Sequence, residues 1–173
     1  SAEGRKPWER YKEFSYVRRL ANVFDYSSFF YYSAGHLCDN VGDLQDLKET
    51  DPLARVVFVP KDSRGPRLIS CEPSEFMFVQ QGLWALMRDR VRSYPAIAAQ
   101  LDFTDQRRNQ WLARIGSVNP DLYATLDLKE ASDRVSMELV ARLFPENWVT
   151  ALRASRSRGT RLPDGTVVPF HKF

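Results

Sequence analysis

The hydrophobic and polar positions along the chain predict two β-hairpins. Residues 54–60 (ARVVFVP) form a continuous β-branched and aromatic run closed by proline, and residues 66–71 (PRLISC) form a second short apolar run. The turn-forming residues between them include basic side chains, so we expect a hairpin with a basic tip. Near the end of the chain, residues 161–170 (RLPDGTVVPF) place Pro-Asp-Gly between two apolar runs, which predicts a second hairpin with a tight turn.

Helical spacing of apolar residues predicts helices in the rest of the chain. Apolar side chains recur at helical spacing, which places them on one helix face: Phe76, Val79, Leu83, Leu86 and Met87. The expected helices run from residue 74 to about 92, from 104 to about 116, from a start near 131–133 to Pro145, and from 147 to about 155. The mixture of hairpins and helices predicts an α+β fold.

Residues 122–128 (LYATLDL) alternate strictly between two faces, which predicts a β-strand with a packed leucine face. Asp127 lies on the opposite, outward face near the end of this expected strand, and Asp133 follows six residues later. An outward carboxylate at a strand end can hold a hard divalent cation while leaving it open to substrate. The alternative is structural, because Asp133 could simply cap the helix that it begins.

Composition predicts one folded, water-soluble domain. The chain has 173 residues, of which 43% are hydrophobic, and its formal net charge is +3. Cys38 and Cys71 lie far apart and are interpreted as reduced thiols, and the spacing of His36 and Cys38 is only a weak metal-binding signal. No apolar stretch approaches the roughly 20 residues of a membrane span, and the first residues lack a signal-peptide core. We therefore expect a reducing, aqueous compartment.

Basic residues are clustered, which favours a polyanionic partner. Lys61, Arg64 and Arg67 recur every three residues around the first expected turn, a spacing suited to holding a triphosphate or a pyrophosphate leaving group. Together with Asp127, they suggest nucleotide chemistry. A second cluster comprises Arg153, Arg156, Arg158 and Arg161, which form either an RNA-binding strip or a solvated strip without a ligand.

The first 37 residues combine an aromatic stretch, FDYSSFFYY over residues 24–32, with basic positions such as Arg5, Lys6 and Arg10. Such a mixture fits either stacking on single-stranded nucleic acid or an amphipathic helix with an aromatic core face. Residues 38–51 are acidic and polar and read as a connector or a solvated helix.

Four stretches in this order resemble the RNA-dependent RNA polymerase (replicase) of levivirus-type RNA phages and their narnavirus- and ourmiavirus-like relatives. They are VVFVPKDSRGPRLISCEP, FTDQRRNQWLARIGS, YATLDLKEASDRVS and LPDGTVVPFHKF. The resemblance covers about residues 54–173 and implies part of a right-hand polymerase. Residues 54–118 would be fingers with the NTP-binding hairpin, residues 119–140 the first palm motif, and residues 141–173 a helix and hairpin leading to the next palm motif. Residues 1–53 stay without an assigned role.

The resemblance also implies roles for individual residues. Lys61, Arg64 and Arg67 would bind the incoming triphosphate, Asp127 would coordinate catalytic Mg²⁺, and Asp133 would sense the ribose 2′-hydroxyl. The implied ligands are NTPs and the RNA template and product, in the cytoplasm of an infected host or, for some relatives, in mitochondria.

One feature of the family is missing from this sequence. The family supplies further metal carboxylates from a later Gly-Asp-Asp turn, whereas this chain has no Asp-Asp pair and its one Gly-Asp pair, Gly42-Asp43, precedes the basic hairpin. We therefore expect the chain alone to be inactive, with the rest of the palm removed or carried on a second polypeptide, and with host proteins as further partners. The alternative is a non-catalytic RNA-binding module derived from a polymerase.

Overall fold

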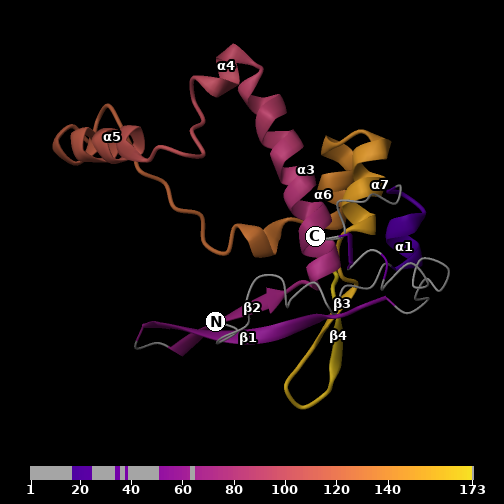
Figure 1. The fold of residues 1–173 in the computed structure, drawn as a ribbon. Coiled ribbons are helices and arrows are strands. Elements are labelled where there is room, and N and C mark those ends of the chain that lie inside the picture. Colours follow the sequence, from indigo (N-terminus) through magenta and orange to yellow (C-terminus); the bar gives the residue numbers. More distant parts are fainter. Residues whose placement is uncertain (1–16, 25–33, 36–37, 39–50, 63–64, 173) are drawn as a thin grey trace. The chain divides into compact units, whose positions relative to one another are not determined.

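The structure is a computed structural model that describes residues 17–24, 34–35, 38, 51–62 and 65–172 (Figure 1). The chain forms two compact units. The first unit comprises residues 1–83 and 136–173, and the second unit comprises residues 84–135. The second unit is thus an insertion in the sequence of the first, and the two are described separately below.

The first predicted hairpin is confirmed in the first unit. Strand β1 (Ala54–Asp62) pairs antiparallel with β2 (Gly65–Cys71), and the register places Val57 opposite Ile69 and Val59 opposite Arg67. Gly65 has a φ of 122°, a backbone conformation that residues with a Cβ atom rarely adopt. The glycine at the end of the predicted turn therefore has a clear conformational role.

The second predicted hairpin is also confirmed, and it extends the same sheet. Strand β3 (Gly159–Arg161) pairs antiparallel with β4 (Val167–Pro169) and parallel with β1, which gives the strand order β2-β1-β3-β4. A Cβ atom on Gly159 would lie 2.7 Å from the carbonyl oxygen of Val168, so this strand requires glycine where the backbones approach.

Helices pack together to form the core of the first unit. The helices of this part are α1 (Arg18–Ala21), the first half of α3 (Ser74–Arg92), α6 (Met137–Leu143) and α7 (Glu146–Ala154). The core cluster consists of Val17, Leu20, Phe76, Val79 and Leu83, with Trp148, Ala151 and Leu152 of α7 packed against it. The predicted helices over residues 74–92 and 147–155 are therefore confirmed. Of the face predicted for the first helix, Phe76, Val79 and Leu83 are buried, whereas Leu86 is exposed and Met87 is half-buried, because these two lie in the part of α3 that belongs to the second unit.

The second unit contains the end of α3, the short helix α4 (Pro95–Ala98), helix α5 (Arg107–Val118) and a 3₁₀ turn, η4 (Ser132–Arg134). Helix α5 confirms the helix predicted over residues 104–117. The rings of Trp84 and Phe103 meet edge to face, with 5.1 Å between their centroids. None of residues 84–135 is buried, so local contacts rather than a core hold this unit.

Two predictions are wrong, namely the strand over residues 122–128 and the first residue of the helix that follows it. Residues 122–128 form no β-strand, because all seven side chains are exposed and no described strand offers a hydrogen-bonding ladder. The helix expected from residues 131–133 instead begins at Met137, after η4. Ser136 has extended backbone and caps this helix, since its Oγ accepts a hydrogen bond from the Leu139 amide at 3.0 Å.

Among the helices of the described residues, none combines the length and the apolar character needed to span a membrane.

Candidate functional site

The segment that carries Asp127 and Asp133 is an exposed turn of the second unit. Glu130, between the two aspartates, has a φ of 54°, which lies in the left-handed region and reverses the chain. The Arg134 amide donates to the Ala131 carbonyl at 3.3 Å, and Arg134 Nε donates to the Lys129 carbonyl at 3.2 Å. The two aspartates therefore lie at either end of a locally closed turn, with both side chains exposed to ligands.

Asp127 can supply one oxygen ligand to a metal ion. Proteins usually hold Mg²⁺ with one or two carboxylates while water and substrate phosphates complete the octahedron. Among the described residues, no three His, Cys, Asp or Glu side chains gather into a metal-binding group. The exposed carboxylate of Asp127 thus fits part of a magnesium site of this open type. His36 lies outside the described residues, so the weak signal from its spacing with Cys38 is not tested.

The predicted triphosphate-binding residues lie on the β1–β2 hairpin of the first unit. Lys61 belongs to β1, and Arg67 belongs to β2, where it is exposed and opposite Val59. Arg64 lies outside the described residues. The first strand is longer than predicted, so Lys61 belongs to β1 rather than to the turn, and Arg67 belongs to the strand paired with it.

The four arginines of the predicted RNA-binding strip have different environments. Arg156 is half-buried: its Nη2 donates to the Lys172 carbonyl at 2.5 Å, its Nη1 lies 3.1 Å from Met137 Sδ, and its guanidinium lies over the Phe170 ring. Burial lowers the pKa of Arg156, with the charge of Glu72 acting in the opposite sense. These contacts tie the segment after β4 to α6, so Arg156 has a role in the fold itself.

Arg158 also has a protein partner, since its Nε lies 3.2 Å from Asp51 Oδ2. Arg153 and Arg161 are exposed, and neither forms an ion pair with a carboxylate in the part of the chain that the structure describes. The strip predicted from the sequence therefore divides into two arginines that contact protein groups and two that face solvent.

Sequence reasoning missed a polar cluster that holds the start of this strip. Glu72 accepts hydrogen bonds from the backbone amide of Ser157, at 3.1 Å, and from Ser157 Oγ, and Ser157 is fully buried. Arg19 donates to the carbonyls of Arg153 and Arg156 at 3.0 and 2.7 Å. No spacing signal could have revealed these contacts, because Glu72 and Ser157 are 85 residues apart.

Arg19 is also the centre of an ion-pair group. Its Nε lies 3.1 Å from Asp51 Oδ1, and its guanidinium lies 4.8 Å from the centroid of the Phe76 ring. Burial lowers the pKa of Arg19, and the neighbouring charge of Asp51 opposes that shift. Asp51 thus joins Arg19 and Arg158, which links α1 to the chain just before β3.

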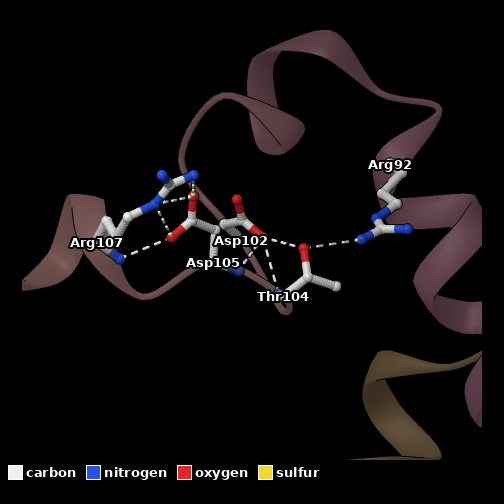
Figure 2. A network of polar contacts seen from close by, with 5 residues as sticks. All are labelled: Arg92, Asp102, Thr104, Asp105 and Arg107. Carbon is white, nitrogen blue, oxygen red and sulfur yellow. Dashed lines mark hydrogen bonds and ion pairs between the residues drawn. The ribbon is translucent and has the colours of Figure 1, made fainter.

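A second polar network, in the second unit, precedes α5 (Figure 2). Asp102 Oδ1 accepts hydrogen bonds from the amide and hydroxyl of Thr104, both at 2.8 Å, and from the amide of Asp105 at 3.0 Å. These hydrogen bonds, led by that from the Thr104 amide, lower the pKa of Asp102 to about 2. Asp105 in turn accepts from the Arg107 amide at 2.9 Å and pairs with its guanidinium, so the network fixes the entry to α5.

Comparison with known proteins identifies the family. The family model described as RNA replicase, beta-chain, matches residues 24–173. The chain is 43% identical over 134 residues to the RNA-directed RNA polymerase subunit beta of Enterobacteria phage SP, in a match that covers 76% of this chain and 22% of that protein. It is 40% identical over 127 residues to the same subunit of Escherichia virus Qbeta, covering 73% and 20% respectively.

A relative of lower identity also matches more than half of the chain. The RNA-directed RNA polymerase beta chain of Escherichia phage MS2 is 36% identical over 118 residues, covering 68% of this chain and 20% of that protein. The chain therefore spans about one fifth of the length of these curated relatives. The predicted resemblance to phage replicases is confirmed, and the chain belongs to the RNA replicase beta-chain family.

Proposed function

We propose that this chain is the part of an RNA-directed RNA polymerase that contributes the triphosphate-binding hairpin and the first metal-binding carboxylate. The observation that carries the proposal is the exposed turn from Asp127 to Asp133, which presents two carboxylates on one local reversal of the backbone. Membership of a family whose relatives are named RNA-directed RNA polymerases supports it. The fingers and palm assignments of residues 54–118 and 119–140 belong to the same proposal.

In the proposed reaction, a primer 3′-hydroxyl or an initiating nucleotide attacks the α-phosphate of an NTP and expels pyrophosphate. Asp127 would hold Mg²⁺, which when bound stabilises negative charge on the reacting phosphate. Lys61, Arg64 and Arg67 would neutralise the phosphates of the incoming nucleotide and of the leaving group. Asp133 would accept a hydrogen bond from the ribose 2′-hydroxyl, which distinguishes NTP from dNTP.

The decisive experiment uses the full-length replicase that contains this segment. Asp127→Asn removes a charged metal ligand without changing the size of the side chain, so it should abolish magnesium-dependent NTP incorporation while RNA binding is retained. Asp121→Asn, in the same exposed segment of the second unit, is the matched control and should leave incorporation unchanged. Normal incorporation by the Asp127→Asn enzyme would refute the proposal.

The role of Arg67 has its own test. A charge-assisted contact with phosphate contributes roughly 1.5 to 3 kcal/mol, so Arg67→Ala should raise KM for NTP by about 10- to 150-fold. Template affinity should fall by less, because a long RNA strand keeps its other phosphate contacts. An equal loss in both measurements would contradict the assignment of Arg67 to the triphosphate.

The role of Asp133 is tested through sugar selection. Asp133→Ala should lower the preference for NTP over dNTP as well as the rate. An unchanged preference would leave Asp133 with a purely structural role in the turn.

A second candidate function is a non-catalytic RNA-binding module, which the solvent-facing side chains of Arg153 and Arg161 favour. We expect the 173-residue chain by itself to bind single-stranded RNA with salt-dependent affinity and not to incorporate NTPs. Incorporation by this chain alone would show that the carboxylates it contains are sufficient for catalysis.

A further inference from the structure

Three arginines from three different strands share one face of the sheet in the first unit. The parallel register of β1 and β3 places Arg55 beside Arg161, and the antiparallel register of β1 and β2 places Arg67 beside Val59. Side chains alternate between faces along a strand, so Arg55 and Val59 point to the same side. Arg55, Arg67 and Arg161 therefore lie on one face, and all three are exposed.

The fold itself does not account for this concentration of charge. The register adds Val57, Val59, Ile69, Cys71 and Val167 to the same face, and beyond the irregularity after Val59 it pairs Asp62 with Gly65 at the end of the hairpin. The strand positions next to Arg55 and Arg161 on this face are therefore not acidic. Among the side chains that the structure describes, none of the three arginines forms an ion pair with a carboxylate. Like charges side by side on neighbouring strands destabilise a sheet. An anionic ligand would remove the penalty of placing Arg55 beside Arg161.

We propose that this sheet face binds the phosphate backbone of single-stranded RNA, with Arg55 as a contact residue that no sequence motif identified. The inference rests on the proposed function in that RNA is the polymer handled by this chain. Arg67 lies opposite Val59, which follows Arg55 by four residues along β1. At 3.3 Å per residue, this separation along the strand direction is about 13 Å. That span exceeds the length of a triphosphate group but fits successive phosphodiesters of an extended strand.

The chemistry of this face also specifies the mode of binding. No aromatic side chain occupies its described strand positions, since Phe58 and Phe170 are not among them. Base stacking on aromatic rings is thus not provided here. The contact of Arg55 should therefore contribute equally to binding of oligouridylate and oligoadenylate.

The test is a salt series on the 173-residue chain with fluorescently labelled oligouridylate. Each phosphate contact contributes about 0.7 to the slope of log affinity against log salt for single strands. Arg55→Gln and Arg161→Gln should each reduce the slope by about that amount, and Arg55→Lys should restore it. Arg142→Gln is the matched control: Arg142 is exposed on α6, where it pairs with Glu138 at 2.6 Å, and its loss changes net charge equally.

Fold integrity is checked by thermal melting. Arg55→Gln should melt at or above the temperature of the unaltered chain, because the substitution removes a like-charge contact without uncovering a core residue. A fall in melting temperature that accompanies the loss of slope would overturn the inference in favour of a structural role for Arg55.

Three further outcomes would overturn it. Equal slopes for Arg55→Gln and Arg142→Gln would show that only net charge matters, and absence of RNA binding by the unaltered chain would leave the face without its ligand. Weaker ATP binding by Arg55→Gln, matching its loss of RNA affinity, would instead identify a triphosphate site. Each of these results is independent of the Asp127→Asn experiment, so the failure of either proposal can be recognised separately.

Discussion

The first unit buries side chains from α1, α3, α6 and α7, whereas residues 84–135 bury none. The first unit is held by contacts between residues distant in sequence, such as Phe76 against Leu20 and Glu72 against Ser157. The second is held by contacts within a few residues, such as those of Asp102 with Thr104. The comparison shows that the proposed catalytic carboxylates lie in the part whose order depends on local hydrogen bonds.

This distribution has an energetic reason. Free energies of local opening range from near zero in exposed segments to the global value in a core, and functional segments come from the low end. The turn from Asp127 to Asp133 includes Glu130 with a positive φ, which adds backbone strain to a segment without burial. We expect the second unit to respond to local changes and the first unit to respond to changes in packing.

The largest effect should come from the core of the first unit. Phe76→Ala removes a fully buried ring and should lower the free energy of unfolding by about 3 to 5 kcal/mol. Trp111→Ala, on the exposed face of α5, should change it by no more than about 0.5 kcal/mol. Urea denaturation of both variants measures the contrast, and similar losses would mean that the second unit has a core of its own.

A smaller loss is expected from the polar contact between β2 and the segment before β3. Glu72→Ala leaves the buried amide and hydroxyl of Ser157 without their acceptor, which should cost about 1 to 3 kcal/mol. Glu138→Ala removes only an exposed pair on α6 and should cost about 0.5 kcal/mol or less. If the two variants unfold at the same urea concentration, the Ser157 contact contributes nothing beyond a surface pair.

The helix cap at the junction of the two units should have an effect of about 1 kcal/mol. Ser136→Ala removes the acceptor for the Leu139 amide, whereas Ser136→Asn keeps a capping side chain. Thermal melting should therefore separate the two variants. Equal destabilisation by alanine and asparagine would place the role of Ser136 in its strand-like bridge with Lys172 instead.

The smallest and most local effect is a response to acid in the second unit. The pKa of Asp102 is lowered to about 2, against about 3.9 in an unfolded chain. A lowered folded-state pKa means that the contribution of Asp102 to local order is fully present above pH 3.9 or so and is lost as the pH falls through about 2.

NMR titration of the Thr104 and Asp105 amides measures this change, and Asp102→Asn should remove it. Core amides of α3, such as that of Val79, should not follow the same titration. A midpoint near the ordinary value for aspartate would contradict the hydrogen bonding shown in Figure 2.

Periodicity and turn residues in the sequence predicted the helices and hairpins, in which backbone hydrogen bonds join residues that are close in sequence. The helical spacing identified α3 and the buried Phe76, Val79 and Leu83, although it also predicted the exposed Leu86 as part of that face, and the turn residues identified both hairpins. Alternation over residues 122–128 predicted a strand wrongly, because alternation describes the side chains while a strand also needs a partner backbone. The sequence could not indicate whether such a partner is present.

For the candidate site, too, the sequence predicted only which residues lie together when they are close in sequence. Spacing identified Lys61 and Arg67 on one hairpin, and Asp127 and Asp133 on one segment, because each pair is close in sequence. It did not reveal that Arg156 contacts Met137 and Lys172, or that Arg55 adjoins Arg161, because those contacts depend on how the sheet closes. The roles assigned to the site residues stay predictions for the experiments above.

The parallel pairing of β1 with β3 also has a consequence for how the protein is made. Thr160, whose hydroxyl donates to the Ala54 carbonyl at 3.1 Å, follows Ala54 by 106 residues. At 5–20 residues per second, a ribosome needs roughly 5 to 20 s to add that length. During this interval the β1–β2 hairpin has emerged with one edge unpaired, a form in which strands can associate with other chains. We therefore expect one edge of β1, an inner strand of the finished sheet, to stay open to misassembly for seconds during translation, until β3 has been made.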